Sequence, residues 1–269
     1  MELKDREFKQ IRDYIKEHYG IALGDEKSTL VFSRLRPLLK QKGFTDFTEY
    51  INYLISDRTG EAAVVFINRL TTNHTYFMRE PEHFDFLSDT VFPWIEDKFG
   101  RGRDLRLWCA ACSSGEEAYT LQMVAQDYFE NKQGWDTEIL ATDISERVLQ
   151  QATLGIYSKE SLKSMPDDWL KKYFKLYDSD NMVVRDTIKN LITYRKFNLM
   201  EGKLPFKKSF QVIFCRNVMI YFDNNTRETL VNRFYNALEK DGYLFIGHSE
   251  SLSNVKSNFK YVMPAVYKK

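Results

Sequence analysis

Two acidic residues lie near the ends of short apolar runs, where a carboxylate could hold a ligand. Glu117 follows the run DLRLWCAA (104–111) and a turn of small residues that ends at Gly115, and Asp143 lies in a second run, TEILATDIS (137–145). A carboxylate accepts hydrogen bonds at both oxygens, so Asp143 can take the two hydroxyls of a ribose. Glu117 can accept from the ammonium group of a bound amino acid. The small side chains before Gly115 let a ligand approach the backbone closely.

Both carboxylates also fit a purely structural role. Ser114-x-x-Glu117 has the spacing of a capping box, and acidic side chains suit the positive end of a helix. On spacing alone, capping is the preferred interpretation of Glu117. Asp143 could cap a helix that begins near Ser145, and the pattern leaves its two roles equally open. A single glycine makes no dinucleotide fingerprint, so the turn alone is a weak signal.

Cys109 and Cys112 offer a competing hypothesis, a thioredoxin-like redox pair. Against it, the following helix is expected to begin at Gly115, after the second cysteine. A redox site needs a helix N-terminus at its first cysteine, because the helix lowers the pKa of that thiol. The remaining cysteine, Cys215, and the four scattered histidines show no zinc-binding spacing, so no metal site is expected.

These residues need a scaffold of strands and helices. Short buried strands are expected over 104–111, 137–145, 210–217 and 243–247, with an amphipathic helix after each of the first three. This alternation is typical of an α/β fold whose doubly wound, mostly parallel sheet is covered on both faces. Ligands bind such sheets at the carboxyl ends of the strands, which is where the two carboxylates are expected.

The ends of the chain follow other patterns. The first 70 residues are expected to be helical, with Phe8, Ile11 and Ile15 on one face. Pro37 should bend or end part of the second helix. Asp241-Gly242 is expected to stop the helix that precedes the fourth strand, and FKYVMPAVYKK at the C-terminus resembles an edge hairpin.

Composition narrows the classes of function. The chain has 269 residues, is 43% hydrophobic and carries a formal net charge of +1. A packed core is therefore expected, and a general nucleic-acid-binding protein is not. No apolar stretch is long enough to cross a bilayer, and the N-terminal MELKDREFKQ lacks the apolar segment of a secretion signal. With three cysteines, an odd number, we expect a cytoplasmic protein without membrane insertion.

Taken together, five segments resemble one known family, the chemotaxis receptor glutamate methyltransferases (CheR family). They occur in the family's order and spacing, and the resemblance covers essentially the whole chain. The segments are TTNHTYFMRE (71–80), WCAACSSGEEAYT (108–120), LATDIS (140–145), FCRNVMIYF (214–222) and GHSES (247–251). The family often has Pro after the double Glu, where this chain has Ala118, a residue that also suits a helix start.

The resemblance implies a fold, a reaction and partners. The sheet would be of the class I methyltransferase type, in a domain over 91–269 with a small antiparallel insert at about 157–193. A helical N-terminal domain (1–70) would recognise receptors, and a linker (71–90) would cover the cofactor. S-adenosylmethionine would donate a methyl group to glutamate side chains in the cytoplasmic helical region of chemotaxis receptors, leaving S-adenosylhomocysteine. We expect the enzyme to act as a monomer.

The resemblance also assigns roles to individual residues. Arg79, in the linker with Asn73 and Thr75, would pair with the carboxylate of the cofactor's methionine moiety. Glu117 would hold its amino group, which reverses the preference for a cap, and Asp143 would hold the ribose. The adenine contacts would be Asn198 and Leu199, and the segment beside the methyl group would contain Arg216, Asn217 and Tyr221.

The implied chemistry is an in-line displacement at a sulfonium methyl group. A glutamate carboxylate is already ionised at neutral pH, so no general base is required, and catalysis would come from positioning and from removal of water. Arg216 and Tyr221 are the expected catalytic residues, which would orient that carboxylate. Without the resemblance, Arg216 would be interpreted as a surface residue at a strand end and Tyr221 as a core residue.

Basic residues and the insert bear on substrate docking. Five cations occur between Lys27 and Thr45 without an acidic residue, and we expect them to contact the glutamate-rich receptor; they are Lys27, Arg34, Arg36, Lys40 and Lys42. They do not fall on one clean face, so a solvated helix surface is the alternative. Some family members bind a receptor tail as an extra strand of the insert. Here its strand candidates, 182–184 and 191–193, follow a segment without the glycines of such members, so no tail binding is expected.

Overall fold

The computed structural model describes residues 2–71, 74–202 and 204–269. The chain forms two compact units. The smaller contains Met1–His74 and Tyr221–Arg227, and the larger contains Thr75–Ile220 and Glu228–Lys269. None of the described helices combines the length and the apolar character that a membrane crossing requires.

The smaller unit is helical, as the apolar spacing predicts. Phe8, Ile11 and Ile15 are buried on one face of the first helix. Pro37 does not end the second helix, which continues to Lys42. The elements are α1 (Asp5–Tyr19), the short η1 (Asp25–Lys27), α2 (Ser28–Lys42), α3 (Phe47–Ser56) and α4 (Glu61–Leu70).

A short segment from late in the chain belongs to this unit. Ile21 forms an isolated antiparallel bridge with Phe222, and Ala22 N donates to the Tyr221 carbonyl at 2.8 Å. Lys16 also pairs with Asp223 at 2.8 Å. The family-like segment 214–222 therefore ends in the helical unit and begins in the larger one.

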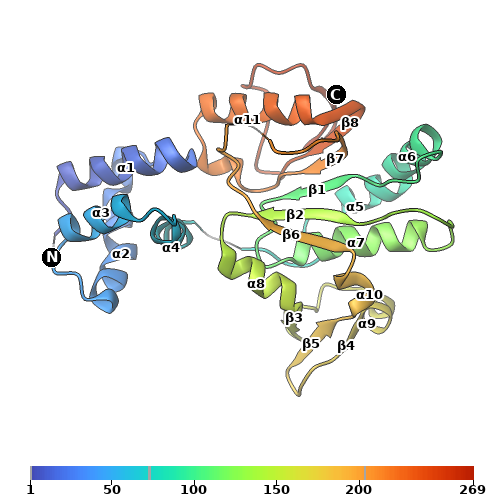
Figure 1. Ribbon diagram of the computed structural model, residues 1–269, viewed down its shortest axis with the longest axis horizontal. Coiled ribbons are helices and arrows are strands. Elements are labelled where there is room, and N and C mark those ends of the chain that lie inside the picture. Colours follow the sequence, from blue (N-terminus) through green and yellow to red (C-terminus); the bar gives the residue numbers. More distant parts are fainter. Residues whose placement is uncertain (1, 72–73, 203) are drawn as a thin grey trace. The chain divides into compact units, whose positions relative to one another are not determined.

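The larger unit is built on a seven-stranded sheet, and the prediction of a doubly wound, mostly parallel sheet is confirmed (Figure 1). The order is β6-β2-β1-β7-β8-β10-β9, in which the first five strands are parallel to one another and β10 pairs antiparallel with both β8 and β9. The strands are β1 (Leu107–Ala110), β2 (Ile139–Asp143), β6 (Ile192–Lys196), β7 (Phe210–Phe214), β8 (Leu238–Phe245), β9 (Lys260–Met263) and β10 (Val266–Lys268). The C-terminal hairpin is thus confirmed, with Pro264 in its turn.

Helices cover both faces of the sheet (Figure 1). Two of them, α7 (Glu116–Phe129) and α8 (Glu146–Leu154), lie on one side, and α11 (Asn224–Ala237) lies on the other. Successive residues of β1 face opposite layers. The ring of Trp108 packs 5.5 Å from that of Phe234 on α11, whereas Cys109 faces Glu117 on α7. The remaining helical elements of this region are α5 (Glu82–Phe86), η2 (Leu87–Val91), α6 (Phe92–Phe99) and η3 (Met219–Tyr221).

The prediction for the end of α11 is wrong. The helix ends at Ala237, and Leu238–Phe245 is already strand β8, instead of a helix running to Asp241-Gly242. Asp241 has a positive φ of 65°, and the pairing register of β7 with β8 shifts before Val212. The Asp-Gly pair therefore marks an irregularity within a strand, a pattern that resembles a helix stop in the sequence.

A small antiparallel sheet is inserted after α8, as predicted. Its order is β3-β5-β4, with α9 and α10 beside it (Figure 1). Residues 182–184 form its central strand, but 191–193 do not belong to it: Ile192–Lys196 is the edge strand β6 of the main sheet. The elements are β3 (Ile156–Ser158), α9 (Asp167–Tyr173), β4 (Phe174–Leu176), β5 (Asn181–Val184) and α10 (Asp186–Lys189).

Candidate active site

Asp143 is held by the backbone of two turns. It is the last residue of β2, and its Oδ2 accepts from Ser113 N at 2.9 Å, in the turn after β1. Its Oδ1 accepts from Ser145 N at 2.9 Å, at the entry to α8. Burial raises the pKa of Asp143, and the amide hydrogen bonds counteract this. The N-cap of α8 is Ser145 and not Asp143. The Asp143 carboxylate instead holds the turns at the carboxyl ends of β1 and β2, where a ligand is expected.

Glu117 lies in the first turn of α7, and the capping-box interpretation is wrong. The N-cap of α7 is Gly115, no side-chain hydrogen bond caps the helix within the described residues, and the Ser114 hydroxyl donates to Glu116 instead. The Glu117 carboxylate accepts from the Cys109 thiol at 3.2 Å and from Arg216 Nη1 at 2.9 Å. Burial raises the pKa of Glu117, against the opposing charge of Arg216. A buried carboxylate with a raised pKa favours a further positive charge beside it.

Gly115 serves packing rather than ligand approach. Its φ of +101° lies in the left-handed region, which L-residues with side chains rarely adopt. A Cβ there would lie 2.8 Å from the Ala152 Cβ and 2.9 Å from the Tyr157 hydroxyl. The glycine therefore lets the turn pack against α8 and β3.

Arg216 joins three segments of the larger unit. Its side chain is only 1% exposed, which excludes the interpretation as a surface residue. Besides Glu117, it pairs with Glu80 through Nη2 at 2.9 Å and Nε at 3.2 Å. Nη2 also donates to the carbonyl of Arg79. Arg216 is therefore a buried cation between two carboxylates, an arrangement that fixes both.

Glu80 is a residue of this network that the sequence analysis did not single out. It ends the segment TTNHTYFMRE with a positive φ of 57°, which is uncommon for glutamate. Burial acts to raise its pKa, but the charge and hydrogen bonds of Arg216 outweigh this and hold the pKa of Glu80 below its usual value. Two features mark Glu80. Its position next to Arg79 is visible in the sequence, whereas its left-handed backbone is not.

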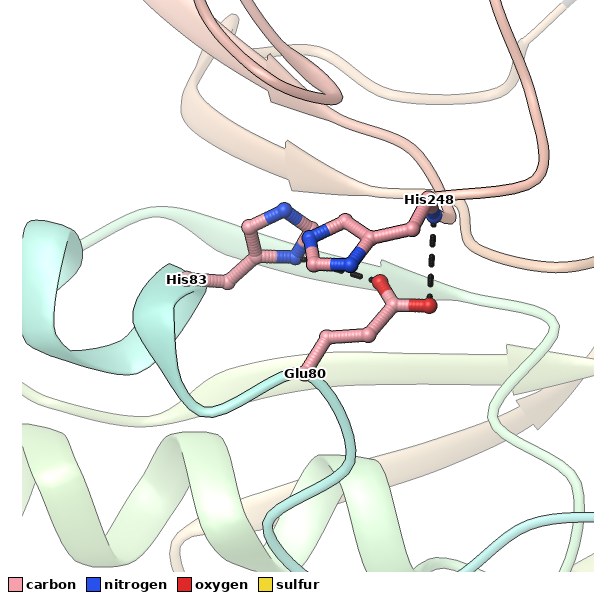
Figure 2. A group of neighbouring side chains, drawn as sticks. All are labelled: Glu80, His83 and His248. Atoms are coloured by element: carbon pink, nitrogen blue, oxygen red, sulfur yellow. Dashed lines mark hydrogen bonds and ion pairs between the residues drawn. The ribbon is translucent and has the colours of Figure 1, made fainter.

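Two histidines adjoin Glu80, as Figure 2 shows. His83 Nδ1 lies 3.6 Å from Glu80 Oε2, and His248 N donates to Glu80 Oε1 at 3.2 Å. The two imidazole rings meet edge to face, with centroids 4.9 Å apart. Burial, assisted by the charge of Arg216, lowers the pKa of His83 to about 4, so this ring is neutral at pH 7.

Asn217 is held by a carboxylate from the segment GHSES. Glu250 accepts from Asn217 N at 2.9 Å, Gly247 N at 2.6 Å and Ile220 N at 3.2 Å. Asn217 has a φ of +60°, and a Cβ at Gly247 would lie 2.3 Å from its Nδ2. Glu250 and Gly247 thus shape the turn after β7, and neither was predicted to act there.

Asn198 and Leu199 follow the edge strand β6. Asn198 Oδ1 accepts from Met200 N at 2.9 Å, which makes a local turn. Leu199 is buried, and its carbonyl accepts from Arg233 Nη1 at 2.7 Å. Phe197 N donates to the Asp143 carbonyl at 2.9 Å, so this turn is tied to the end of β2. Both residues therefore lie, as Asp143 does, at the carboxyl ends of the parallel strands.

The other predicted site residues are placed less fully. Arg79 is partly exposed, with its Nε 4.0 Å from Glu80 and its guanidinium over the ring of Tyr76. Thr75 is also partly exposed, and Asn73 lies outside the described residues. Tyr221 is half-buried in the smaller unit and is not a core residue. The roles assigned to these four residues stay predictions.

The cysteines do not form a redox site. Cys109, Cys112 and Cys215 are free and fully buried. Burial raises the pKa of both Cys109 and Cys112 well above the usual range, and nearby carboxylates raise it further. A reactive thiol needs the opposite, an exposed position and a lowered pKa.

The five predicted docking cations are all exposed in the smaller unit. Arg34 Nη1 donates to the Arg69 carbonyl at 3.3 Å, and Arg36 lies over the ring of Phe32. Lys42 lies over the ring of Tyr53. Their charged groups are therefore accessible, and their role in docking stays a prediction.

Comparisons with known proteins agree with this geometry. Residues 73–267 match the family described as "CheR methyltransferase, SAM binding domain", and residues 6–71 match "CheR methyltransferase, all-alpha domain". The chain belongs to the CheR methyltransferase family. A chemotaxis protein methyltransferase of Borreliella burgdorferi is 44% identical over 98% of this chain and 94% of its own. The corresponding protein of Escherichia coli is 37% identical over 98% of this chain and 91% of its own.

Membership of the CheR family confirms several expectations from the sequence. The fold is that of a class I methyltransferase with an all-helical N-terminal domain, and the activity is S-adenosylmethionine-dependent methyl transfer. These matches identify neither the roles of individual residues nor the receptor that is methylated.

Proposed function

We propose that this enzyme transfers the methyl group of S-adenosylmethionine to glutamate side chains in the cytoplasmic helical region of chemotaxis receptors, acting as a cytoplasmic monomer. The observation that carries the proposal is a pair of partly buried carboxylates at the carboxyl ends of adjacent strands: Asp143 ends β2, and Glu117 lies in the first turn of the helix that follows β1. The segment between β1 and this helix is tied to the end of β2 through Ser113 N, which donates to Asp143 at 2.9 Å. Chemotaxis protein methyltransferases among the relatives support the choice of receptor.

The residues present fit the cofactor. Asp143 accepts from backbone amides at both oxygens, and the remaining acceptor capacity of its carboxylate would serve the ribose. Glu117, whose pKa is raised by burial, favours the cofactor's ammonium group as a further cation. Arg79 would pair with the cofactor's carboxylate, assisted by Thr75 and Asn73, and Asn198 with Leu199 would hold the adenine.

The chain's own residues would then position the acceptor. The bound cofactor supplies an electrophilic methyl group, and the incoming glutamate is already ionised at neutral pH, so no proton needs to be removed. The turn of Asn217, which Glu250 holds, would present this segment beside the methyl group. Tyr221 would donate a hydrogen bond to the acceptor carboxylate. Arg216 pairs with Glu80 and Glu117, so its charge would act from within that network.

Transfer of a labelled methyl group to membranes that contain candidate receptors tests the reaction. We expect incorporation that is released by mild base, as an ester is, and loss of transfer in Tyr221→Phe with little change in affinity for S-adenosylhomocysteine. Base-stable label would show a different acceptor group. A proportional fall of affinity and rate in Tyr221→Phe would remove that residue from the acceptor's side of the site.

Docking of the receptor is tested by reversing exposed charges. Arg34→Glu with Arg36→Glu should slow receptor methylation and leave cofactor binding intact, and the wild-type rate should fall with added salt. Arg101→Glu with Lys163→Glu makes the same change of charge at exposed positions of the larger unit and serves as the control. An equal loss of rate in both double variants, or a rate indifferent to salt, would contradict docking through these cations.

The absence of tail binding is a separate proposal about the insert. The loop before β5 is a tight turn in which Asp178 accepts from Asp180 N and Asn181 N, each at 2.8 Å. These side chains occupy space that a docking strand would need. Titration with the last dozen or so residues of the cognate receptors should show no binding. Micromolar affinity, about −8 kcal/mol, would overturn the proposal.

A further inference from the structure

Three side chains that commonly bind metals meet beside the buried arginine. Glu80, His83 and His248 each offer one nitrogen or oxygen atom, and these atoms all lie within 4.8 Å of one another (Figure 2). Glu80 and His248 are 168 positions apart in the chain, so no ligand spacing is visible in the sequence, and none was predicted. The cluster exists only because the turn after β8 packs against the start of α5.

The separation of His83 from Glu80 suits a shared cation. Nδ1 and Oε2 are 3.6 Å apart, longer than the 2.7–3.2 Å of a hydrogen bond. Two ligands at about 2.1 Å from a tetrahedral metal ion would be about 3.4 Å apart. The ring of His83 is fully buried, and within the described part of the chain its Nδ1 has no hydrogen-bond partner. A neutral imidazole thus directs an unused nitrogen at a carboxylate oxygen.

The other nitrogen of His83 is already oriented. Nε2 lies 3.4 Å from the Pro264 carbonyl, a contact that favours a proton on Nε2 and a lone pair on Nδ1. Metal-binding histidines commonly donate their second ring nitrogen to a backbone carbonyl in this way. His248 is exposed, so its ring can complete the set with a small movement of its side chain.

We propose that Glu80, His83 and His248 form a binding site for a divalent transition metal ion, with Zn²⁺ the best match to two imidazoles and one carboxylate. Such a ligand set is open, because tetrahedral zinc takes a fourth ligand, which here would be water. Mg²⁺ prefers oxygen ligands and does not suit the two imidazoles. Nothing in this inference depends on the proposed methyl acceptor.

Arg216 is the feature that opposes a cation here. Its Nη2 and Nε lie 2.9 and 3.2 Å from Glu80 Oε2, the oxygen nearest to His83, so a metal ion would share this carboxylate with a guanidinium. Arg216 keeps two other acceptors, the Glu117 carboxylate and the Arg79 carbonyl, and is not left unpaired when Glu80 also binds a metal. The Glu80 carboxylate can accept at both of its oxygens. The site therefore tolerates a metal ion and binds it more weakly than a site without the arginine.

Titration of metal-free, untagged enzyme tests the site. The protein is treated with a chelator, and binding of Zn²⁺ and of Mg²⁺ is measured by calorimetry. We expect one Zn²⁺ per chain and no detectable Mg²⁺ binding. Co²⁺ should give the intense visible absorption of a tetrahedral site with nitrogen and oxygen ligands.

Two variants separate this site from adventitious binding. His248→Asn removes an exposed ligand without disturbing the core and should weaken Zn²⁺ binding at least tenfold. His18→Asn changes a histidine on α1 and should bind as the wild type does. Glu80→Gln should also lose affinity, which excludes the cysteines as the ligands. Absence of Zn²⁺ binding to the wild type, or equal affinity in His248→Asn and wild type, would overturn the proposal.

Discussion

The two partly buried carboxylates of the site, Asp143 and Glu117, are held in different ways. Asp143 is fixed by backbone amides, Ser113 N and Ser145 N, from the turns on either side of it. Glu117 is fixed by side chains, the Arg216 guanidinium and the Cys109 thiol. The partners of Asp143 follow from the strand-turn-helix repeat, whereas the charged partner of Glu117 comes from 99 positions further along the chain.

The contacts of Asp143 are therefore rigid, whereas those of Glu117 are adjustable. Backbone amides at strand ends are placed by the sheet and stay in place when a ligand binds. An ion pair between side chains can be exchanged, since Arg216 also has Glu80 and the Arg79 carbonyl as partners. We therefore expect Asp143 to be organised before the cofactor binds. We expect Glu117 to share its charge between Arg216 and the ligand.

The largest effect should come from Arg216→Ala. Removal of one partner of a buried ion pair leaves uncompensated charge, and here two carboxylates are affected. The free energy of unfolding should fall by about 3–5 kcal/mol, measured by urea denaturation. Glu80→Gln with Glu117→Gln in the Arg216→Ala background should recover part of this loss, because no buried charge then remains unpaired. A cost under about 1 kcal/mol for Arg216→Ala would show that water compensates the two carboxylates.

Glu117→Gln should weaken cofactor binding without a comparable loss of folding. Hydrogen bonds to charged groups contribute about 1.5–3 kcal/mol, so affinity for S-adenosylhomocysteine should fall by roughly one to two orders of magnitude. The ammonium group pairs with the ionised carboxylate, and burial raises the pKa of Glu117, so wild-type affinity should weaken as the pH is lowered from neutrality toward the acidic range in which Glu117 becomes protonated.

Calorimetry across this pH range should show a smaller slope in Glu117→Gln than in the wild type. A remaining slope is expected from Asp143, because burial also raises the pKa of that carboxyl group. An unchanged slope in Glu117→Gln would mean that Glu117 is not titrated against the ligand.

The role of Asp143 can be predicted from the sequence more readily than that of Glu117. Asp143 and the strands beside it follow from apolar runs that end in polar residues, a local pattern with a known consequence in parallel sheets. Pattern alone assigned Glu117 to a cap, because the spacing Ser114-x-x-Glu117 is identical whether the carboxylate turns back or into the core. Only the resemblance to the CheR family favoured a ligand-binding role for Glu117 over a cap.

Long-range partners were not accessible from the sequence. Glu80 and His248 lie on a turn before α5 and a turn after β8, and the sheet order that joins them cannot be read from local periodicity. The end of α11 was misplaced for a related reason: Asp241-Gly242 is a helix stop in an isolated chain, but tertiary pairing with β7 makes the preceding residues a strand. Tertiary contacts decided both cases.

Asp143→Ala should have a moderate effect on cofactor affinity. Two ligand hydroxyls lose their acceptor, which costs about 1–3 kcal/mol in the binding of S-adenosylhomocysteine. Asp136→Ala is the matched control, since Asp136 precedes the same strand, is exposed and accepts from the backbone amide of Glu138 at 3.1 Å. The control should bind like the wild type. Equal affinities in all three proteins would remove Asp143 from the site.

The smallest effect concerns the thiol that donates to Glu117. Cys109→Ser with Cys112→Ser should retain most methyl transfer, and added reductant should not change the wild-type rate, because neither buried thiol is reactive.

Cys109→Ser alone keeps a donor for the Glu117 carboxylate, whereas Cys109→Ala removes it. A neutral hydrogen bond contributes about 0.5–1.5 kcal/mol, so the alanine variant should bind S-adenosylhomocysteine up to about tenfold differently from the serine variant. A loss of methyl transfer in both serine variants, with activity restored by added thiols, would instead support a redox role. Equal affinity for S-adenosylhomocysteine in Cys109→Ser and Cys109→Ala would show that Arg216 is the partner that holds Glu117.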